Sequence, residues 1–234
     1  MTEPQSANHI LAALPPAEYD SIARGFVPVD LVYDADLYDR DSVIRHVYFP
    51  LRGMVSLVSS VGSRPSLELG VVGNEGMVGL QLYQGVASSN HRAVVQGGGS
   101  ALRLEAAFFL AECERRSGLT KLLNRFAFTM MTQISQSAFC LRFHPVDQRL
   151  CRWLLMTADR MGSDDVHLTQ AFLSNMLGVR REAVNRSSTR LEEQQLVEHS
   201  RGRMVIIDRA LMIAASCECY ALIRSSELAM ASGS

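Results

Sequence analysis

Residues 168–208 read LTQAFLSNMLGVRREAVNRSSTRLEEQQLVEHSRGRMVIID, and this stretch decides the fold. Thr169 is suited to cap the start of a short helix, because a threonine hydroxyl accepts a hydrogen bond from a free N–H of the first turn. Apolar residues then recur at helical spacing, at Phe172, Leu173, Met176 and Leu177. Gly178 is expected to end this helix, because glycine adopts the left-handed conformation at little cost.

The spacing predicts a second helix from about Arg180 to Gln195. At about 100° per residue, long polar side chains share its front, and small or apolar ones share its back. The front carries Arg181, Glu182, Asn185 and Arg186, and the back carries Val184, Ser187, Ser188 and Leu191. Two short helices joined by a glycine-containing turn are typical of a helix-turn-helix, whose second helix can enter the major groove of DNA. Ser174 is small enough to let the two helices approach closely.

Residues 196–200 and 204–208 predict two short strands, and Arg201-Gly202-Arg203 lies between them, so we expect a β-hairpin with a basic turn. Arginine reads guanine edges and glutamate can accept a hydrogen bond from cytosine. An ordinary surface helix with solvated charges is the alternative, but the turn glycine, the polar front and the basic hairpin occur together. We therefore predict DNA binding. The predicted base-reading residues are Arg181, Glu182, Asn185 and Arg186. The predicted phosphate contacts are Thr169, Arg180, Arg201 and Arg203. Phosphate contacts position the protein on the DNA but do not determine which base sequence it binds.

This stretch resembles the winged helix-turn-helix of Crp/Fnr-type bacterial transcription regulators, most specifically in the Arg-Glu-x-x-x-Arg sequence of residues 181–186. Asn185 departs from the small residue usual there. VYFPLRGMVSLV (47–58) and LGVVGNEGMVGL (69–80) resemble strand-turn-strand phrases of the same family. The resemblance covers roughly residues 20–220. It implies an α+β fold with an N-terminal double-stranded β-roll, jelly-roll-like and related to cyclic-nucleotide-binding domains, a long dimerisation helix and a C-terminal winged helix-turn-helix. It also implies a homodimer on a palindromic double-stranded DNA site, with RNA polymerase as a further partner.

The rest of the chain can be divided along these lines. Six short β-type runs separated by Gly and Pro predict a sandwich or barrel. These β-type runs are 27–33, 42–49, 54–60, 67–72, 93–96 and 100–104. The glycines at Gly97–Gly99, between the last two of them, are interpreted as a hairpin turn. His144-Pro145 should end the preceding helix, because a residue before proline avoids the helical conformation. The predicted domains are a β-roll sensor at 1–115, a dimerisation helix at 116–143 and a DNA-binding domain at 144–234.

The predicted dimerisation helix has apolar and small residues at the 4-3-4-3-4 spacing of a coiled-coil seam. The predicted seam consists of Leu123, Ala127, Met130, Ile134, Ser137 and Leu141. The alternative is a helix buried inside the core of a monomer. Length and spacing favour the dimer.

Nucleotide-binding members of the resembled family hold the phosphate with an Arg and a neighbouring Ser, and the ribose with a Glu. The corresponding segment here, residues 74–96, has no such phrase, and Arg92 lies away from the expected place. We therefore expect no cofactor and regard a cyclic nucleotide as an unsuitable ligand. A cyclic-nucleotide-gated regulator with an unusual pocket remains an alternative.

The five cysteines are an odd number in a chain that we expect to be cytoplasmic, which argues against a disulfide framework. No N-terminal cysteine cluster is present, unlike in the iron–sulfur branch of the resembled family. We expect idle, buried thiols and no metal site. A redox-sensing protein that uses the one close pair, Cys217 and Cys219, is the rival hypothesis from another class.

Composition excludes several other classes. The net charge of −1 means that DNA affinity has to come from a local basic patch. No apolar run is long enough to span a membrane, and the first residues do not resemble a signal peptide. The histidines form no HExxH pair and no GxSxG sequence occurs. We therefore expect no catalytic residues and no enzyme activity.

Overall fold

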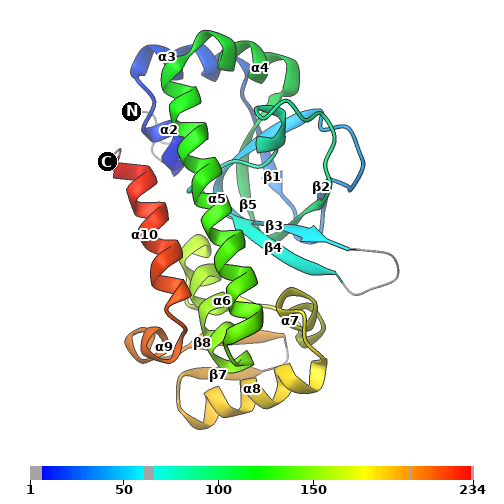
Figure 1. The fold of residues 1–234 in the computed structure, drawn as a ribbon, viewed down its shortest axis with the longest axis vertical. Coiled ribbons are helices and arrows are strands. Elements are labelled where there is room, and N and C mark those ends of the chain that lie inside the picture. Colours follow the sequence, from blue (N-terminus) through cyan, green and yellow to red (C-terminus); the bar gives the residue numbers. More distant parts are fainter. Residues whose placement is uncertain (1–6, 61–65, 201, 233–234) are drawn as a thin grey trace.

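The computed structural model describes residues 7–60, 66–200 and 202–232. The first half of the chain forms a five-stranded antiparallel sheet beside a long helix, α5 (Ser117–Phe143), and the last third forms a three-stranded antiparallel sheet with short helices around it (Figure 1). The predicted α+β class, with a β-roll followed by a long helix and a winged helix-turn-helix, is confirmed. Among the described helices, none is long and apolar enough to cross a membrane.

The larger sheet has the order β1-β5-β3-β4, with β2 paired to another part of β5. Its strands are β1 (Val27–Leu31), β2 (Asp36–Tyr38), β3 (His46–Ser59), β4 (Leu67–Val72) and β5 (Arg92–Glu105). Because β5 pairs with three strands and is 14 residues long, it is the central element of the roll. A short turn of 3-10 helix, η2 (Leu80–Leu82), lies between β4 and β5.

The sequence predicts a hairpin turn at Gly97–Gly99, and this prediction is wrong. The run is part of the continuous strand β5. Its partner β3 is also continuous across Gly53, where we expected a break, and the β3–β5 register shifts on both sides of that residue. Gly53 has φ +94°, and a Cβ on Gly99 would lie 2.3 Å from the carbonyl oxygen of Arg52. The glycines therefore allow a bulge in two long strands that bend together.

Short helices frame the roll at both ends. The N-terminal ones are α2 (His9–Ala12), α3 (Pro16–Ile22) and η1 (Ala23–Gly25), and Pro16 opens α3, as a proline at the first helical position can. After β5 the chain forms α4 (Ala106–Arg115) and then α5. Phe49, Phe109, Phe126 and Leu123 are fully buried in the core between the roll and α5.

The C-terminal part begins with α6 (Val146–Met161), which follows Pro145 and ends at Gly162 with φ +63°. It continues with β6 (Asp165–His167), α7 (Gln170–Leu177), α8 (Arg181–Glu193), β7 (Val197–Ser200) and β8 (Arg203–Ile206). The strands have the order β6-β8-β7, and β6 was missed by the sequence analysis because three residues give no readable pattern.

The last two helices are α9 (Arg209–Ala215) and α10 (Cys219–Ser232). Helix α10 packs along α5, so that it leads from the small sheet back towards the roll (Figure 1). Met230, near its end, belongs to the core of the roll.

Candidate nucleic-acid interface

The turn between α7 and α8 is fixed by local hydrogen bonds. The Thr169 hydroxyl accepts from the backbone N–H of Phe172 at 3.2 Å and caps α7. Gly178 ends α7 in the left-handed conformation, with φ +61°. Ser174 donates its hydroxyl proton to the carbonyl oxygen of Val179 at 2.6 Å. Ser174 therefore closes the turn through a hydrogen bond, in addition to being small.

Helix α8 has one buried and one exposed side, as predicted. Its back, formed by Val184, Ser187, Ser188 and Leu191, is buried on the rest of the C-terminal part. The four predicted base-reading residues are all exposed; they are Arg181, Glu182, Asn185 and Arg186. Gln170 of α7 donates a hydrogen bond to Asn185 Oδ1 at 3.0 Å, so the neighbouring helix orients this amide. The structure thus places two guanidiniums, a carboxylate and an amide together on one exposed surface.

The hairpin β7–β8 lies beside this pair of helices, and Ser200 pairs with Arg203 across the turn. Arg203 forms two hydrogen bonds of 2.8 Å with the Asp165 carboxylate, and these hydrogen bonds lower the pKa of Asp165. Arg180, directly before α8, is exposed. Thr169 is exposed as well, although its hydroxyl already serves as the cap. Arg201 lies outside the described residues.

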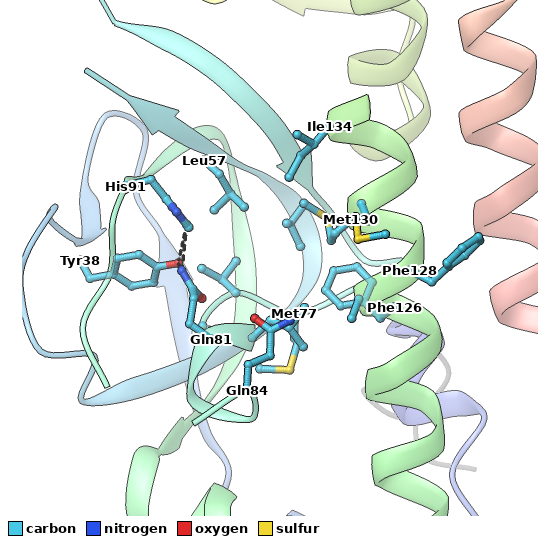
Figure 2. A pocket seen from close by; sticks show the side chains of 16 residues that line it. Tyr38, Leu57, Met77, Gln81, Gln84, His91, Phe126, Phe128, Met130 and Ile134 are labelled. Atoms are coloured by element: carbon cyan, nitrogen blue, oxygen red, sulfur yellow. Dashed lines mark hydrogen bonds between the residues drawn. The ribbon is translucent and has the colours of Figure 1, made fainter. Parts of the chain in front are cut away.

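A pocket of about 420 Å³ lies between the roll and α5 (Figure 2). Apolar side chains form most of its wall, and on the α5 side they include Phe126, Phe128, Met130, Met131 and Ile134. Within the described part of the chain, no lysine or arginine lines it. The pocket therefore offers no cation to hold a phosphate.

Three polar side chains of the pocket, those of Tyr38, Gln81 and His91, lie at its end away from α5 (Figure 2). The Gln81 amide nitrogen lies 2.9 Å from His91 Nε2, and the Tyr38 hydroxyl lies 3.4 Å from the same nitrogen (Figure 2). Burial lowers the pKa of His91 and raises the pKa of Tyr38 to about 12. Both groups are consequently uncharged at neutral pH. Arg92, the arginine that the sequence offers for this region, does not line the pocket and forms an ion pair with Asp36 at 3.4 Å.

The predicted coiled-coil seam of α5 divides into two groups. Leu123 and Met130 are buried in the chain's own core and are not available to a partner. Ile134 and Leu141 are each 40% exposed, and Ala127 and Ser137 are half-buried. Together with other exposed apolar residues of α5, Ile134 and Leu141 form a row along one side of the helix. We call this set the α5 stripe, and its members are Phe128, Met131, Ile134, Ala138 and Leu141.

The structure also brings together four side chains that the sequence analysis did not group. The donor atoms of Cys140, His144, Cys217 and Cys219 all lie within 4.8 Å of one another. Cys217 and Cys219 were considered as a pair in the sequence, whereas Cys140 and His144 were overlooked because more than 70 residues separate them from that pair. Their own C-x-x-x-H spacing, at the end of a predicted helix, was the available signal.

Three comparisons with known proteins bear on this arrangement. Residues 148–215 match the model of the Crp-like helix-turn-helix domain. None of the curated proteins matches the chain.

Solved structures match the chain over most of its length. A protein described as a transcriptional regulator of the crp/fnr family from Eubacterium rectale ATCC 33656 has a TM-score of 0.70 at 14% identity, over 90% of this chain and 98% of that one. FixK2 from Bradyrhizobium japonicum also has a TM-score of 0.70 at 14% identity, over 82% and 98%. A CRP-family transcriptional regulator from Thermus thermophilus has a TM-score of 0.67 at 17% identity, over 80% and 96%.

Proposed function

The chain has the fold of Crp/Fnr-type transcription regulators and a Crp-like helix-turn-helix domain, and from this premise we propose that it regulates transcription as a homodimer that binds a palindromic DNA site. The observation that carries the proposal is the exposed front of α8. It presents Arg181, Glu182, Asn185 and Arg186 on a helix whose opposite side is buried. Side chains of these types, at the start of the second helix of such a motif, can reach base edges in the major groove.

The α5 stripe supports the homodimer. Phe128 and Met131 are 65% and 64% exposed, and large apolar side chains in a row along a helix favour burial against a partner. A second chain related by two-fold symmetry would present a second α8. The bound site would then be a palindrome with half-site centres about one helical turn apart. RNA polymerase is the further partner that we propose for a regulator of this type.

The test is DNA binding by the full chain. The site is first selected from random double-stranded DNA, and single-base variants of it are then titrated at several salt concentrations. Arg181→Ala and Arg186→Ala should each weaken binding by about 1–3 kcal/mol per lost bidentate contact and relax specificity at one base pair of each half-site. Arg190→Ala is the matched control, because Arg190 is also exposed on α8 but pairs with Asp147 at 2.8 Å.

Substitutions in the hairpin turn should behave differently from those on α8. Arg201→Ala should weaken binding to all sequences alike and lower the salt slope by about one per contact, or about two in a dimer. If Arg181→Ala and Arg186→Ala also weaken binding equally for every base variant, α8 does not read bases and the assignment of these residues fails.

We propose that the effector of this regulator is not a cyclic nucleotide. The pocket between the roll and α5 is apolar with a neutral polar end, and a buried phosphate needs a positive charge with hydrogen-bond donors. A cyclic-nucleotide-gated regulator is the rival function, and direct binding of the nucleotide separates the two.

A further inference from the structure

We propose that Cys140, His144, Cys217 and Cys219 bind one metal ion in a tetrahedral site, and that zinc is the ion this donor set suits. Three thiolates and one imidazole form a closed coordination shell of the kind that structural zinc sites use. This proposal does not depend on the proposed DNA-binding function, because it rests on donor atoms at the joint between α5 and α10.

The distances between the donor atoms fit a single ion. Cys140 Sγ lies 3.2 Å from Cys217 Sγ and 3.4 Å from His144 Nδ1, and Cys219 Sγ lies 3.7 Å from the same nitrogen. Zinc–sulfur bonds of about 2.3 Å and zinc–nitrogen bonds of about 2.0–2.1 Å place tetrahedral donors roughly 3.5–3.8 Å apart. All four donors lie within 4.8 Å of one another, so small side-chain movements suffice to enclose an ion. An iron–sulfur cluster would place several irons between its ligands and needs them further apart.

The local structure explains why these residues meet. Cys140 is in the last turn of α5 and His144 caps that helix, with its backbone N–H bonded to the Cys140 carbonyl oxygen at 3.1 Å. Residues four apart on a helix face the same side. Cys217 lies in the turn between α9 and α10, and Cys219 is the first residue of α10. An ion at this point would join the end of α5 to the start of α10.

The orientation of His144 is that of a metal ligand. Its Nδ1 faces the thiols, while its Nε2 lies 3.2 Å from Glu218 Oε1. Ligating histidines commonly donate their second ring N–H to a carboxylate, which fixes the ring and its tautomer. Glu218 occupies this position and is itself exposed.

The charges around the thiols also favour a bound ion. A divalent ion with three thiolates carries one net negative charge, which is costly to bury without a nearby cation. Arg149 and Arg152 of α6 are both buried, and electrostatic interactions connect each of them to Cys140. In the described part of the chain, Arg152 forms no ion pair within 4 Å, and the Nε atom of Arg152 has no hydrogen-bond partner. Glu68 lies further away but still interacts electrostatically with Arg152. A negatively charged metal site would give Arg152 a counter-charge in addition to Glu68.

The experiment uses the full chain, purified without a histidine tag and without chelators. Mass spectrometry of the metals should find about one zinc per chain. Exchange for cobalt(II) should give the intense visible absorption of tetrahedral cobalt with thiolate ligands. Cys217→Ser and His144→Gln should lose most of the bound metal, whereas Cys113→Ser and Cys151→Ser should keep it. These two control thiols lie outside the cluster, and burial raises the pKa of each to about 12.

Glu218→Gln provides a second test that does not remove a ligand. The side chain is exposed, so the variant should fold, and competition with a coloured chelator should show a 10–100-fold lower metal affinity, of the order expected for a lost outer partner. Purified protein without metal that also gives no cobalt absorption would overturn the proposal. So would a Cys217→Ser variant with full metal content, or a Cys140–Cys217 disulfide in metal-free protein with no metal uptake after reduction.

Discussion

Glu68 places a carboxyl group at the contact between the roll and α6. The Ser56 hydroxyl donates to its Oε2 at 2.6 Å, and the Trp153 indole N–H donates to its Oε1 at 2.8 Å. Burial raises the pKa of Glu68 to about 7, although both hydrogen bonds act in the opposite direction. The protonation state of this single residue therefore changes near neutral pH.

Because the pKa of Glu68 is raised in the folded chain, we expect the stability of the fold to decrease as the pH rises. Between pH 4.5, its ordinary pKa, and about 7 the folded chain keeps a proton that the unfolded chain releases, so stability is lost across this window and the loss is complete above pH 7. Glu68→Gln should be more stable than the parent at pH 8 by up to about 3 kcal/mol, and the difference should vanish near pH 4. Urea unfolding at a series of pH values measures it, and a pH-independent difference would refute this role.

At the scale of elements, α5 packs against two parts of its own chain and leaves a third side exposed. One side contacts the roll and a second contacts α10, whereas the α5 stripe stays exposed along the rim of the pocket. The 3.5-residue spacing in the sequence identified a long apolar face but could not separate core from partner contacts. Leu123 and Met130 satisfy the same spacing as Ile134, and only the packing of the roll shows which of them is covered.

Ile134→Asp should prevent self-association of the chain. Ile134 is 40% exposed in the single chain, so the substitution should leave the protomer folded. Against a partner helix, an aspartate would bury an unpaired charge, which is strongly destabilising. Sedimentation at micromolar concentration should show a dimer for the parent chain and a monomer for the variant.

Val32→Asp is the control for that measurement. Val32 is 63% exposed but lies outside α5, so this variant should remain dimeric. A monomeric parent chain, or an Ile134→Asp variant as dimeric as the parent, would exclude the α5 stripe as the interface.

Elements set by local patterns were predictable from the sequence. The cap at Thr169, the turn at Gly178 and the two-sided α8 follow from residues close to one another in the chain, and the structure has all three. Features that depend on distant residues were not predictable. Gly97–Gly99 continues a strand because Gly53 and Arg52 lie opposite, and Cys140 meets Cys217 because α10 returns along α5.

At the scale of the whole molecule, one buried ion cluster connects three parts of the chain. Arg160 of α6 bonds to Glu75, in the turn after β4, at 2.8 Å and to Glu227 of α10 at 2.5 Å. All three side chains are at most 14% exposed. The cluster thus links the roll, the first helix of the C-terminal part and the last helix of the chain.

Arg160→Met should destabilise the chain by about 3–5 kcal/mol, because it leaves two buried carboxylates close together without their cation. Chemical unfolding at neutral pH measures the loss. Arg190→Ala, which removes an exposed ion pair with Asp147, should have little effect by the same measurement. Equal effects of the two substitutions would show that burial of the cluster does not matter.

The chemistry of the pocket predicts the response to nucleotides. Calorimetry of the full chain with cyclic AMP or cyclic GMP should give no saturable heat in the micromolar range, and binding of the selected DNA should need neither. A saturable heat from cyclic AMP, lost on substitution of a pocket residue such as Gln81→Ala, would reverse this conclusion.

Phe128, Met131 and Ile134 belong both to the α5 stripe and to the wall of the pocket. A molecule in the pocket and a second chain on α5 would consequently touch the same side chains, and two equilibria that share contacts are thermodynamically linked. The linkage is reciprocal, so an effector that prefers the paired chains by some factor strengthens their pairing by the same factor per site. The apparent affinity for such an effector would then rise with the concentration of the protein itself.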